Sequence, residues 1–369
     1  MEIPKRAVLL LLPAFIFSCR STVPVAAEGE KDILYTCVSI DTIHVDMENS
    51  SYAGFSGVNN GEYYFFDEFF NYYYPVSIDG VPGTRSMGLG RGPNELPIRS
   101  PVGVVARGED FMVMGGSYAA YLFNESHNPN PQRLNIKVSG QKNSYDASSA
   151  YTLFREVVMR ASDKTFFYNI LGSNDAVDPI EKYDYFENGH FLMRVDIESG
   201  EALPMGEYSD YYIKNYADIR HMIMTYYDVD KKGNLYVCHQ ADSLIYVSDR
   251  KFKPVKAFGF EGKNMDTDYT NPSPSTADFE RAYINDLAHK GYYYWLEYVD
   301  ETDMTFRSYQ KGSHSDRDGL QIYRGATLIA DVEVPKGFRV AGYIAPYYVT
   351  QIICDEDNET MKFYRFRLD

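Results

Sequence analysis

The sequence has little cysteine and no long apolar run: 369 residues include only 4 cysteines and 1 tryptophan. A membrane-spanning helix needs about 20 consecutive apolar residues. The best candidate, Ala7 to Phe17, is shorter and is broken by Pro13. The cysteines show neither C-x-x-C spacing nor a spacing with histidine that suits zinc. We therefore expect no metal site built on cysteine, and no cofactor is predicted.

Complete catalytic motifs are also missing from the sequence. The nearest match to the G-x-S-x-G nucleophile elbow, Gly54 to Gly57, stops short of it, and H-E-x-x-H does not occur. The segment that starts at Asp228 imitates a calcium loop, but Lys232 and His239 stand where acidic ligands are needed. It is interpreted as a hairpin turn. These absences favour a non-enzymatic protein over an enzyme.

Basic residues are scarce relative to acidic ones, with 36 lysines and arginines against 52 aspartates and glutamates and a net charge of -16. The field of such a chain repels phosphate backbones, because counterion release at nucleic acids needs clustered cations. Nucleic acid is therefore excluded as an expected partner.

The N-terminus carries a targeting signal. Lys5 and Arg6 precede the apolar run and Ser18 precedes Cys19, which is typical of a secretory signal peptide over residues 1–18. Residues 16–19 resemble a bacterial lipobox, whose cysteine becomes the lipidated first residue. The polar, proline-bearing residues 19–31 suit a lipidated tether, and the folded domain is expected over 32–369. This predicts a lipid-anchored protein of the cell envelope at the outer membrane; an ordinary cleaved signal containing a cysteine is the alternative.

Aromatic residues are abundant instead, with 34 tyrosines and 22 phenylalanines, a bias that favours strands. Residues 226–259 show four short strand patterns separated by turns, which is what one propeller blade contains. Weaker copies occupy 61–87, 108–138, 151–208, 282–334 and 339–369. The repetition predicts an all-β fold, a six-bladed β-propeller of four-stranded antiparallel blades. The Pro-, Ser- and Thr-rich residues 265–278 are predicted to form a loop between blades.

The last repeat is one strand short, and residues 33–47 are strand-like at the opposite end of the chain. A strand from there would close the ring and leave no open sheet edge. Cys37 and Cys354 would then belong to neighbouring strands and could form a disulfide in an oxidising compartment. The alternative is that Cys37, Cys238 and Cys354 are three small buried thiols.

The run Met87 to Pro97, MGLGRGPNELP, has the glycines of a phosphate loop but not the spacing of G-x-G-x-x-G or of G-x-x-x-x-G-K-[ST]. Together with KKGNLYV, DSLIYVSD and KAFGFEG, residues 88–95 resemble the six-bladed, TolB-like β-propeller lipoproteins common in Bacteroidetes. That resemblance implies the fold and an envelope location, and it implies no defined activity.

Five residues are candidates for a ligand site. Arg91, Glu95 and Arg99 could converge near the axial opening, where the planar fork of Arg99 suits a carboxylate; alternatively, Arg91 and Glu95 form an ion pair that ties the turn. His221 and His239 flank the best-defined repeat and are the histidines placed best to reach a central pocket.

These features predict a ligand-binding or scaffolding module at the cell envelope, with a glycan, peptide or envelope protein as ligand, held by loop aromatics and arginines at the axial face. One alternative is a propeller-fold carbohydrate hydrolase or lyase with His and acidic residues in the central channel. Another is a structural partner in an outer-membrane complex. A pocket that brings His, Glu or Asp, and Arg within hydrogen-bond reach would favour catalysis.

Overall fold

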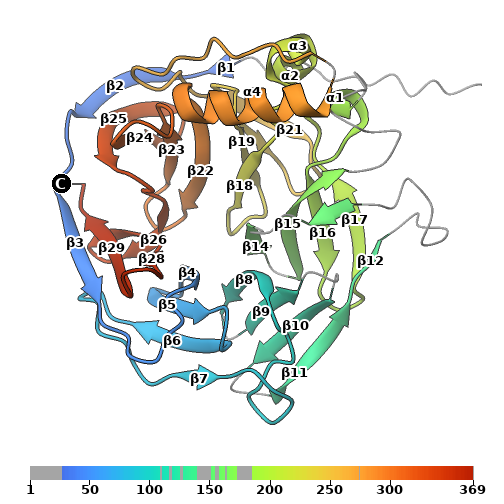
Figure 1. Ribbon diagram of the computed structural model, residues 1–369, viewed down its shortest axis with the longest axis vertical. Coiled ribbons are helices and arrows are strands. Elements are labelled where there is room, and N and C mark those ends of the chain that lie inside the picture. Colours follow the sequence, from blue (N-terminus) through green and yellow to red (C-terminus); the bar gives the residue numbers. More distant parts are fainter. Residues whose placement is uncertain are drawn as a thin grey trace, which may run out of the picture.

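The protein is a six-bladed β-propeller. The computed structural model describes residues 27–108, 110–115, 119–124, 128–138, 151–153, 158–162, 164–172, 185–273 and 275–368. Its strands form six small antiparallel sheets arranged in a ring (Figure 1). The first strands of the blades contact one another in succession around the channel, and the last of them contacts the first. The predicted fold class is confirmed.

The first three blades each begin with the strand nearest the channel. The first contains β4 (Gly54–Asn59), β5 (Glu62–Asp67), β6 (Tyr72–Val76) and β7 (Ser86–Met87). The second contains β8 (Pro101–Arg107), β9 (Asp110–Gly115), β10 (Ala119–Asn124) and β11 (Asn128–Asn135). The third contains β14 (Met159–Ser162), β15 (Thr165–Gly172), β16 (Leu192–Asp196) and β17 (Glu201–Met205); β12 (Lys137–Val138) pairs with β17 and β13 (Tyr151–Leu153) pairs with β15.

The remaining blades follow the same order from the channel outward. The fourth contains β18 (Thr225–Val229), β19 (Leu235–His239), β20 (Ile245–Ser248) and β21 (Pro254–Phe258). The fifth contains β22 (Tyr292–Val299), β23 (Met304–Gln310), β24 (Arg317–Arg324) and β25 (Thr327–Pro335). The sixth contains β26 (Val340–Ile344), β27 (Tyr347–Thr350), β28 (Ile353–Asp355) and β29 (Thr360–Phe366). β27 and β28 both pair with β29, at different positions along it.

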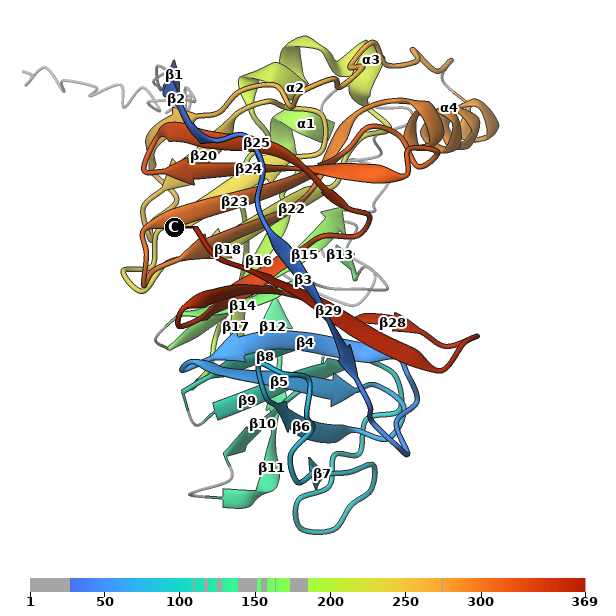
Figure 2. The same ribbon diagram turned by 90° about the vertical axis from the view of Figure 1, so that its left-hand side faces the viewer.

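The N-terminal segment completes the sixth blade, as predicted. β3 (Ile40–Val45) pairs antiparallel with β29, so the chain closes its own ring (Figure 2). The segment before it runs along the outer edges of two further blades, because β1 (Ala27–Glu28) pairs parallel with β21 and β2 (Glu30–Tyr35) with β25. Residues 27–28 and 30–31, which precede the expected domain start at residue 32, thus pair with the outer edges of these blades.

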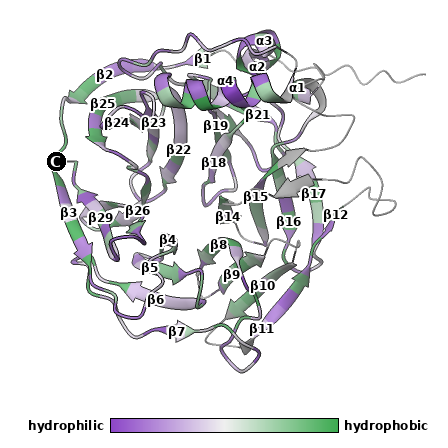
Figure 3. Ribbon diagram, in the orientation of Figure 1, coloured by the Kyte–Doolittle hydropathy of each residue, from purple (hydrophilic) through white to green (hydrophobic). Residues whose placement is uncertain are grey.

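The ring is held together by apolar contacts between neighbouring blades. In the described residues, six buried clusters join adjacent sheets, for example Tyr63 and Phe65 of the first blade with Phe363 of the sixth. Figure 3 shows hydrophobic residues in the strands all around the ring. Burial of such aromatic side chains is the main stabilising contribution to a sheet-on-sheet interface. The sixth-to-first cluster therefore also holds the ring closed.

Helices lie over one face of the ring, which the sequence did not predict. They are α1 (Tyr185–Asn188), α2 (Asp210–Lys214), α3 (Tyr216–Ile219) and α4 (Thr276–His289) (Figure 2). The Oγ of Ser275 accepts a hydrogen bond from the Asp278 N–H at 3.2 Å and caps α4. The last residues of the predicted loop 265–278 therefore belong to this helix. No helix in the described ranges is long and apolar enough to cross a membrane.

The predicted disulfide is not present. Cys37, Cys238 and Cys354 are free thiols, and Cys238 alone is fully buried while Cys37 is exposed. Cys354 on β28 pairs with Met361 of β29, which in turn pairs with Val45 at the far end of β3. Cys37 precedes the opposite end of β3, so the two thiols lie at opposite ends of the blade with β29 between their strands.

Candidate functional site

A cavity of about 1520 Å³ follows the central channel and is the candidate functional site. Its wall comes mainly from the first strands of the six blades and from the residues just before them. Ligand pockets for small molecules commonly measure about 300–1,000 Å³. This cavity therefore has room for a ligand of several linked units.

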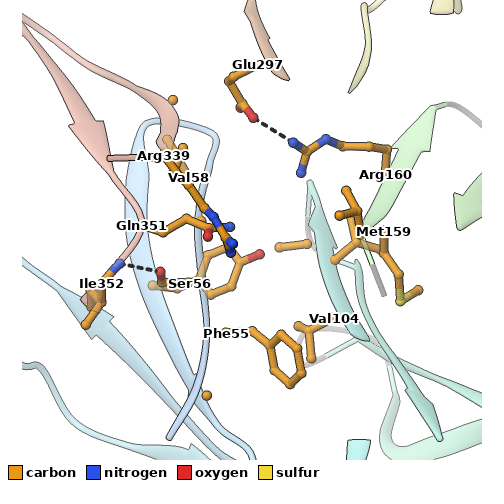
Figure 4. A pocket seen from close by; sticks show the side chains of 18 of the residues that line it. Phe55, Ser56, Val58, Val104, Met159, Arg160, Glu297, Arg339, Gln351 and Ile352 are labelled. Atoms are coloured by element: carbon orange, nitrogen blue, oxygen red, sulfur yellow. Dashed lines mark hydrogen bonds and ion pairs between the residues drawn. The ribbon is translucent and has the colours of Figure 1, made fainter. Parts of the chain in front are cut away.

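Arg160 lies in the wall of the cavity between two carboxylates. Its Nε lies 2.8 Å from Asp228 Oδ1 and its Nη2 lies 2.7 Å from Glu297 Oε2 (Figure 4). The three side chains come from β14, β18 and β22, so the network joins the first strands of three consecutive blades. Asp228 Oδ2 also accepts a hydrogen bond from the Tyr298 N–H at 2.7 Å.

Burial shifts the ionisation of this network. It raises the pKa of Glu297 well above its usual value, and the Arg160 charge offsets this only in part. The pKa of Asp228 is raised for the same reason, against the opposing effects of Arg160 and of backbone donors. Burial disfavours the charged form of Arg160 too, but the two carboxylates outweigh it and raise the pKa of its guanidinium. One cation thus faces two carboxyl groups that hold protons more tightly than usual.

Trp295, the single tryptophan, lies between two arginines. Its ring centroid is 5.0 Å from the Cζ of Arg160 and 5.6 Å from the Cζ of Arg339. Its Nε1–H donates to the Val340 carbonyl at 2.6 Å, which fixes the indole against the start of β26. Arg339 and Gln351 line the cavity side by side (Figure 4). Cation–π contacts of this kind contribute about 0.5–2 kcal/mol.

One mouth of the cavity has an aromatic rim. Phe69, 69% exposed, lines the cavity from the turn between β5 and β6. The buried Asp67 carboxylate holds that turn, because its Oδ1 accepts from the Phe69 and Phe70 N–H groups at 3.0 and 2.8 Å. Arg99, exposed just before β8, lines the cavity as well. Of the five predicted site residues, Arg99 is the one that reaches it.

Arg91 and Glu95 lie outside the cavity lining, and they do not form the predicted ion pair. Glu95 Oε2 instead accepts from the Gly92 N–H at 2.7 Å. A Cβ added at Gly90 would lie 1.9 Å from the same oxygen, so a side chain there would displace the Glu95 carboxylate. The loop thus closes on its own carboxylate, which occupies the Gly92 N–H that a bound anion would otherwise use. It is a turn between blades, as predicted.

His221 and His239 also lie outside the cavity lining, so their predicted place in a central pocket is wrong. His221 Nε2 lies 2.8 Å from Asp286 Oδ2, and this buried pair joins the segment after α3 to α4. His239 is buried among the rings of Phe191, Tyr208 and Tyr212, with centroids 5.2, 5.5 and 5.2 Å away. Both histidines are structural.

The sequence did not single out Arg160, Glu297 and Arg339, three of the charged residues that the fold brings to the cavity. Arg160 and Glu297 each stand within an ordinary strand pattern, and 137 positions separate them in the sequence. A register assignment that placed the first strand of every blade on the channel could have found them. No group of three or more His, Cys, Asp or Glu residues arranged for a metal ion occurs in the part of the chain that the structure describes.

The fold and the cavity define a six-bladed β-propeller with a ligand-sized central channel. Neither a protein-family model nor a curated protein matches the sequence. Among solved structures, a member of the DUF4221 family from Bacteroides vulgatus is 14% identical, with 90% of this chain and 97% of that chain covered and a TM-score of 0.64. A Bacteroides fragilis protein named as exported is 12% identical, with 93% and 99% covered and a TM-score of 0.51. At these identities the likeness supports the propeller fold alone.

Proposed function

We propose that this protein is a ligand-binding module of the cell envelope that holds a glycan, peptide or envelope protein in its central cavity. The observation that carries the proposal is the cavity itself, which combines the donors of Arg99 and Arg339 with the exposed ring of Phe69. Concave pockets with convergent polar groups are the usual ligand sites of rigid folds. The ring of blades supplies the rigid support.

Filling the cavity tests this function. Met224 lines the wall just before β18. Met224→Trp is expected to weaken ligand capture at least tenfold, because the added ring occupies the channel. The measurement is binding of the full chain to an array of oligosaccharides and peptides. Val255→Trp, which adds the same ring at a 59% exposed site on β21, is the matched control. Equal capture by wild type and Met224→Trp would refute a site in the channel.

One observation favours the alternative, a carbohydrate hydrolase or lyase. Glu297 lines the cavity and burial raises its pKa well above the usual value, as for a carboxyl group that acts as general acid. Its neighbours in the cavity are arginine and aspartate, whereas both predicted histidines lie elsewhere. Chain-length analysis of bound oligosaccharides after prolonged incubation separates the two functions: shortened products indicate catalysis, and intact ligands indicate binding.

The envelope anchor is a separate part of the proposal and rests on the lipobox-like residues 16–19. Cys19 lies outside the described residues. Cys19→Ala is expected to move the protein from the membrane to the soluble fraction, because stable anchoring needs the acyl chains that a lipidated cysteine carries. Fractionation followed by immunoblotting measures this. Cys37→Ala, at an exposed free thiol, is the matched control. A Cys19→Ala protein that stays in the membrane fraction would contradict the anchor.

A further inference from the structure

Arg339 is a cavity arginine whose donors are unused. Its Cζ lies 5.6 Å from the ring centroids of both Tyr294 and Trp295. No carboxylate among the described residues lies within ion-pair distance of it, and its side chain donates no hydrogen bond to any described residue. A cation–π contact attracts the charge of the guanidinium and leaves its N–H groups for another partner.

Two other arginines show how this protein satisfies such groups, and Arg339 itself is half-buried. Arg160 faces two carboxylates. Arg307, which is fully buried, donates to the Gln321 side chain at 3.0 Å and to the Ser243 and Phe260 carbonyls at 2.8 Å each. Arg339 differs from both, because its donors have no partner among the described residues. A ligand anion is the partner that a planar fork of donors fits best.

The backbone on both sides of the Arg339 side chain is fixed before any ligand arrives. The Gln351 N–H donates to the Arg339 carbonyl at 2.7 Å, and the Trp295 Nε1–H donates to the next carbonyl, that of Val340, at 2.6 Å. Binding then costs little ordering of the receptor, which favours affinity. The backbone that carries Arg339 is therefore preorganised.

Arg99 lies at the same mouth of the cavity. Arg99 and Arg339 stand just before β8 and β26, and the first strands of all blades run in the same direction along the channel. β4 is the strand between β26 and β8 in the ring. Phe69 follows β5, which is antiparallel to β4, so its exposed ring belongs to this mouth too. Two separate cations and one aromatic face therefore converge on one opening.

We propose that this mouth binds an acidic oligosaccharide, with Arg339 holding the carboxylate of one uronic acid unit, Arg99 that of another, and Phe69 against a sugar face. Glu68 and Glu356 line the same end of the cavity. Carboxylates repel the acid groups of either ligand, but they also accept hydrogen bonds from the hydroxyls that every sugar unit carries and that Asp and Glu side chains lack. That difference favours a uronate-containing glycan over a peptide. The inference rests on the proposed function, because it assigns a ligand class to the same cavity.

Calorimetric titration of the full chain with an α-1,4-linked galacturonate tetramer tests the assignment, and the methyl-esterified tetramer removes the charge while keeping the sugar. We expect the acid to bind at least tenfold more tightly than the ester. Arg339→Gln should weaken binding of the acid about ten- to a hundredfold, as expected for losing a charged hydrogen-bonded pair, and change binding of the ester less than threefold. Arg339→Lys should be intermediate, because it keeps the charge but loses the fork.

Arg250→Gln, at an exposed arginine in the turn between β20 and β21, should leave both affinities unchanged. The assignment is overturned if the wild type does not bind the acid at millimolar concentration, if ester and acid bind equally, or if Arg339→Gln binds the acid like wild type. The acid-to-ester ratio of the wild type remains decisive should Arg339→Gln unfold. Binding of a neutral glycan or an acidic peptide that Met224→Trp abolishes would refute the uronate assignment and leave the proposed function intact.

Discussion

Replacing Arg160 with methionine is expected to lower the free energy of unfolding by about 3–5 kcal/mol, the usual cost of leaving a buried charge without its partner. The arginine is 2.8 Å from Asp228 and 2.7 Å from Glu297, and the three side chains are between 8% and 19% exposed. Methionine preserves much of the side-chain volume. The loss of stability therefore comes mainly from removing the guanidinium charge. Denaturant unfolding at neutral pH measures this loss.

The loss of stability caused by Arg160→Met should grow as the pH rises. Burial already raises the pKa of Asp228 and of Glu297, and removing the cation raises both further. A carboxyl group whose folded pKa is raised above its unfolded value destabilises the fold as pH rises above the unfolded value. Arg160→Met should therefore lose more stability at pH 7.5 than at pH 5.

Two further variants define the outcome for the Arg160 network. Adding Asp228→Asn and Glu297→Gln to Arg160→Met should recover at least half of the loss, because the neutral groups need no cation. Lys164→Met is the control, since Lys164 and Glu198 form an ion pair in which both side chains are at least 66% exposed, and such pairs contribute about 0–1 kcal/mol. A loss at Arg160 no larger than that at Lys164 would mean that the network does not hold the blades together.

Much of the fold was predictable because each blade repeats a local pattern. The strands predicted within residues 226–259 match β18 to β21 closely, since tight turns at Gly233 and after Ser248 fix their ends. β4 was missed because Gly54 and Gly57 weaken its strand pattern, although glycine suits the close approach to Phe66 and Tyr64 across the pair. Helix α4 was missed although Ser275 and Asp278 have the spacing of a capping box.

The site was harder to predict than the fold because it depends on contacts between distant segments. Arg99 was found from its position after the glycine turn. His221 and His239 were misplaced because the sequence does not show that Tyr208, Tyr212 and Asp286 fill the space around them. The register of each first strand against the channel decides which side chains line the cavity, and single-strand patterns do not contain it.

The second large prediction concerns His239. Protonation of this one ring should lower the free energy of unfolding by about 3 kcal/mol between pH 6.5 and pH 4. Burial lowers the pKa of His239 to about 4, with Asp242 opposing the shift. The unfolded chain takes up the proton near pH 6.5. The contribution of the neutral His239 ring to the free energy of unfolding is therefore fully present above pH 6.5 and is lost as pH falls toward 4. The difference between the two pKa values corresponds to about 3 kcal/mol at about 1.36 kcal/mol per pKa unit.

The comparison of His239→Gln with wild type isolates this ring from the other titrating groups. The raised pKa values of Asp228 and Glu297 have the opposite effect on stability in the same pH range. Burial raises the pKa of Asp286, but hydrogen bonds from His221 and Thr270 outweigh it and lower that pKa to about 2. Asp286 therefore affects stability only below this pH range. Glutamine keeps a polar group that can bond to the Thr225 hydroxyl, which lies 3.0 Å from His239 Nδ1.

Unfolding free energies measured from pH 4 to pH 7.5 should fall less steeply toward acid in His239→Gln by about 3 kcal/mol. His44→Gln, at an exposed position on β3, should keep the wild-type slope. If His239→Gln follows the wild-type curve at every pH, the buried ring is not the source of the acid sensitivity.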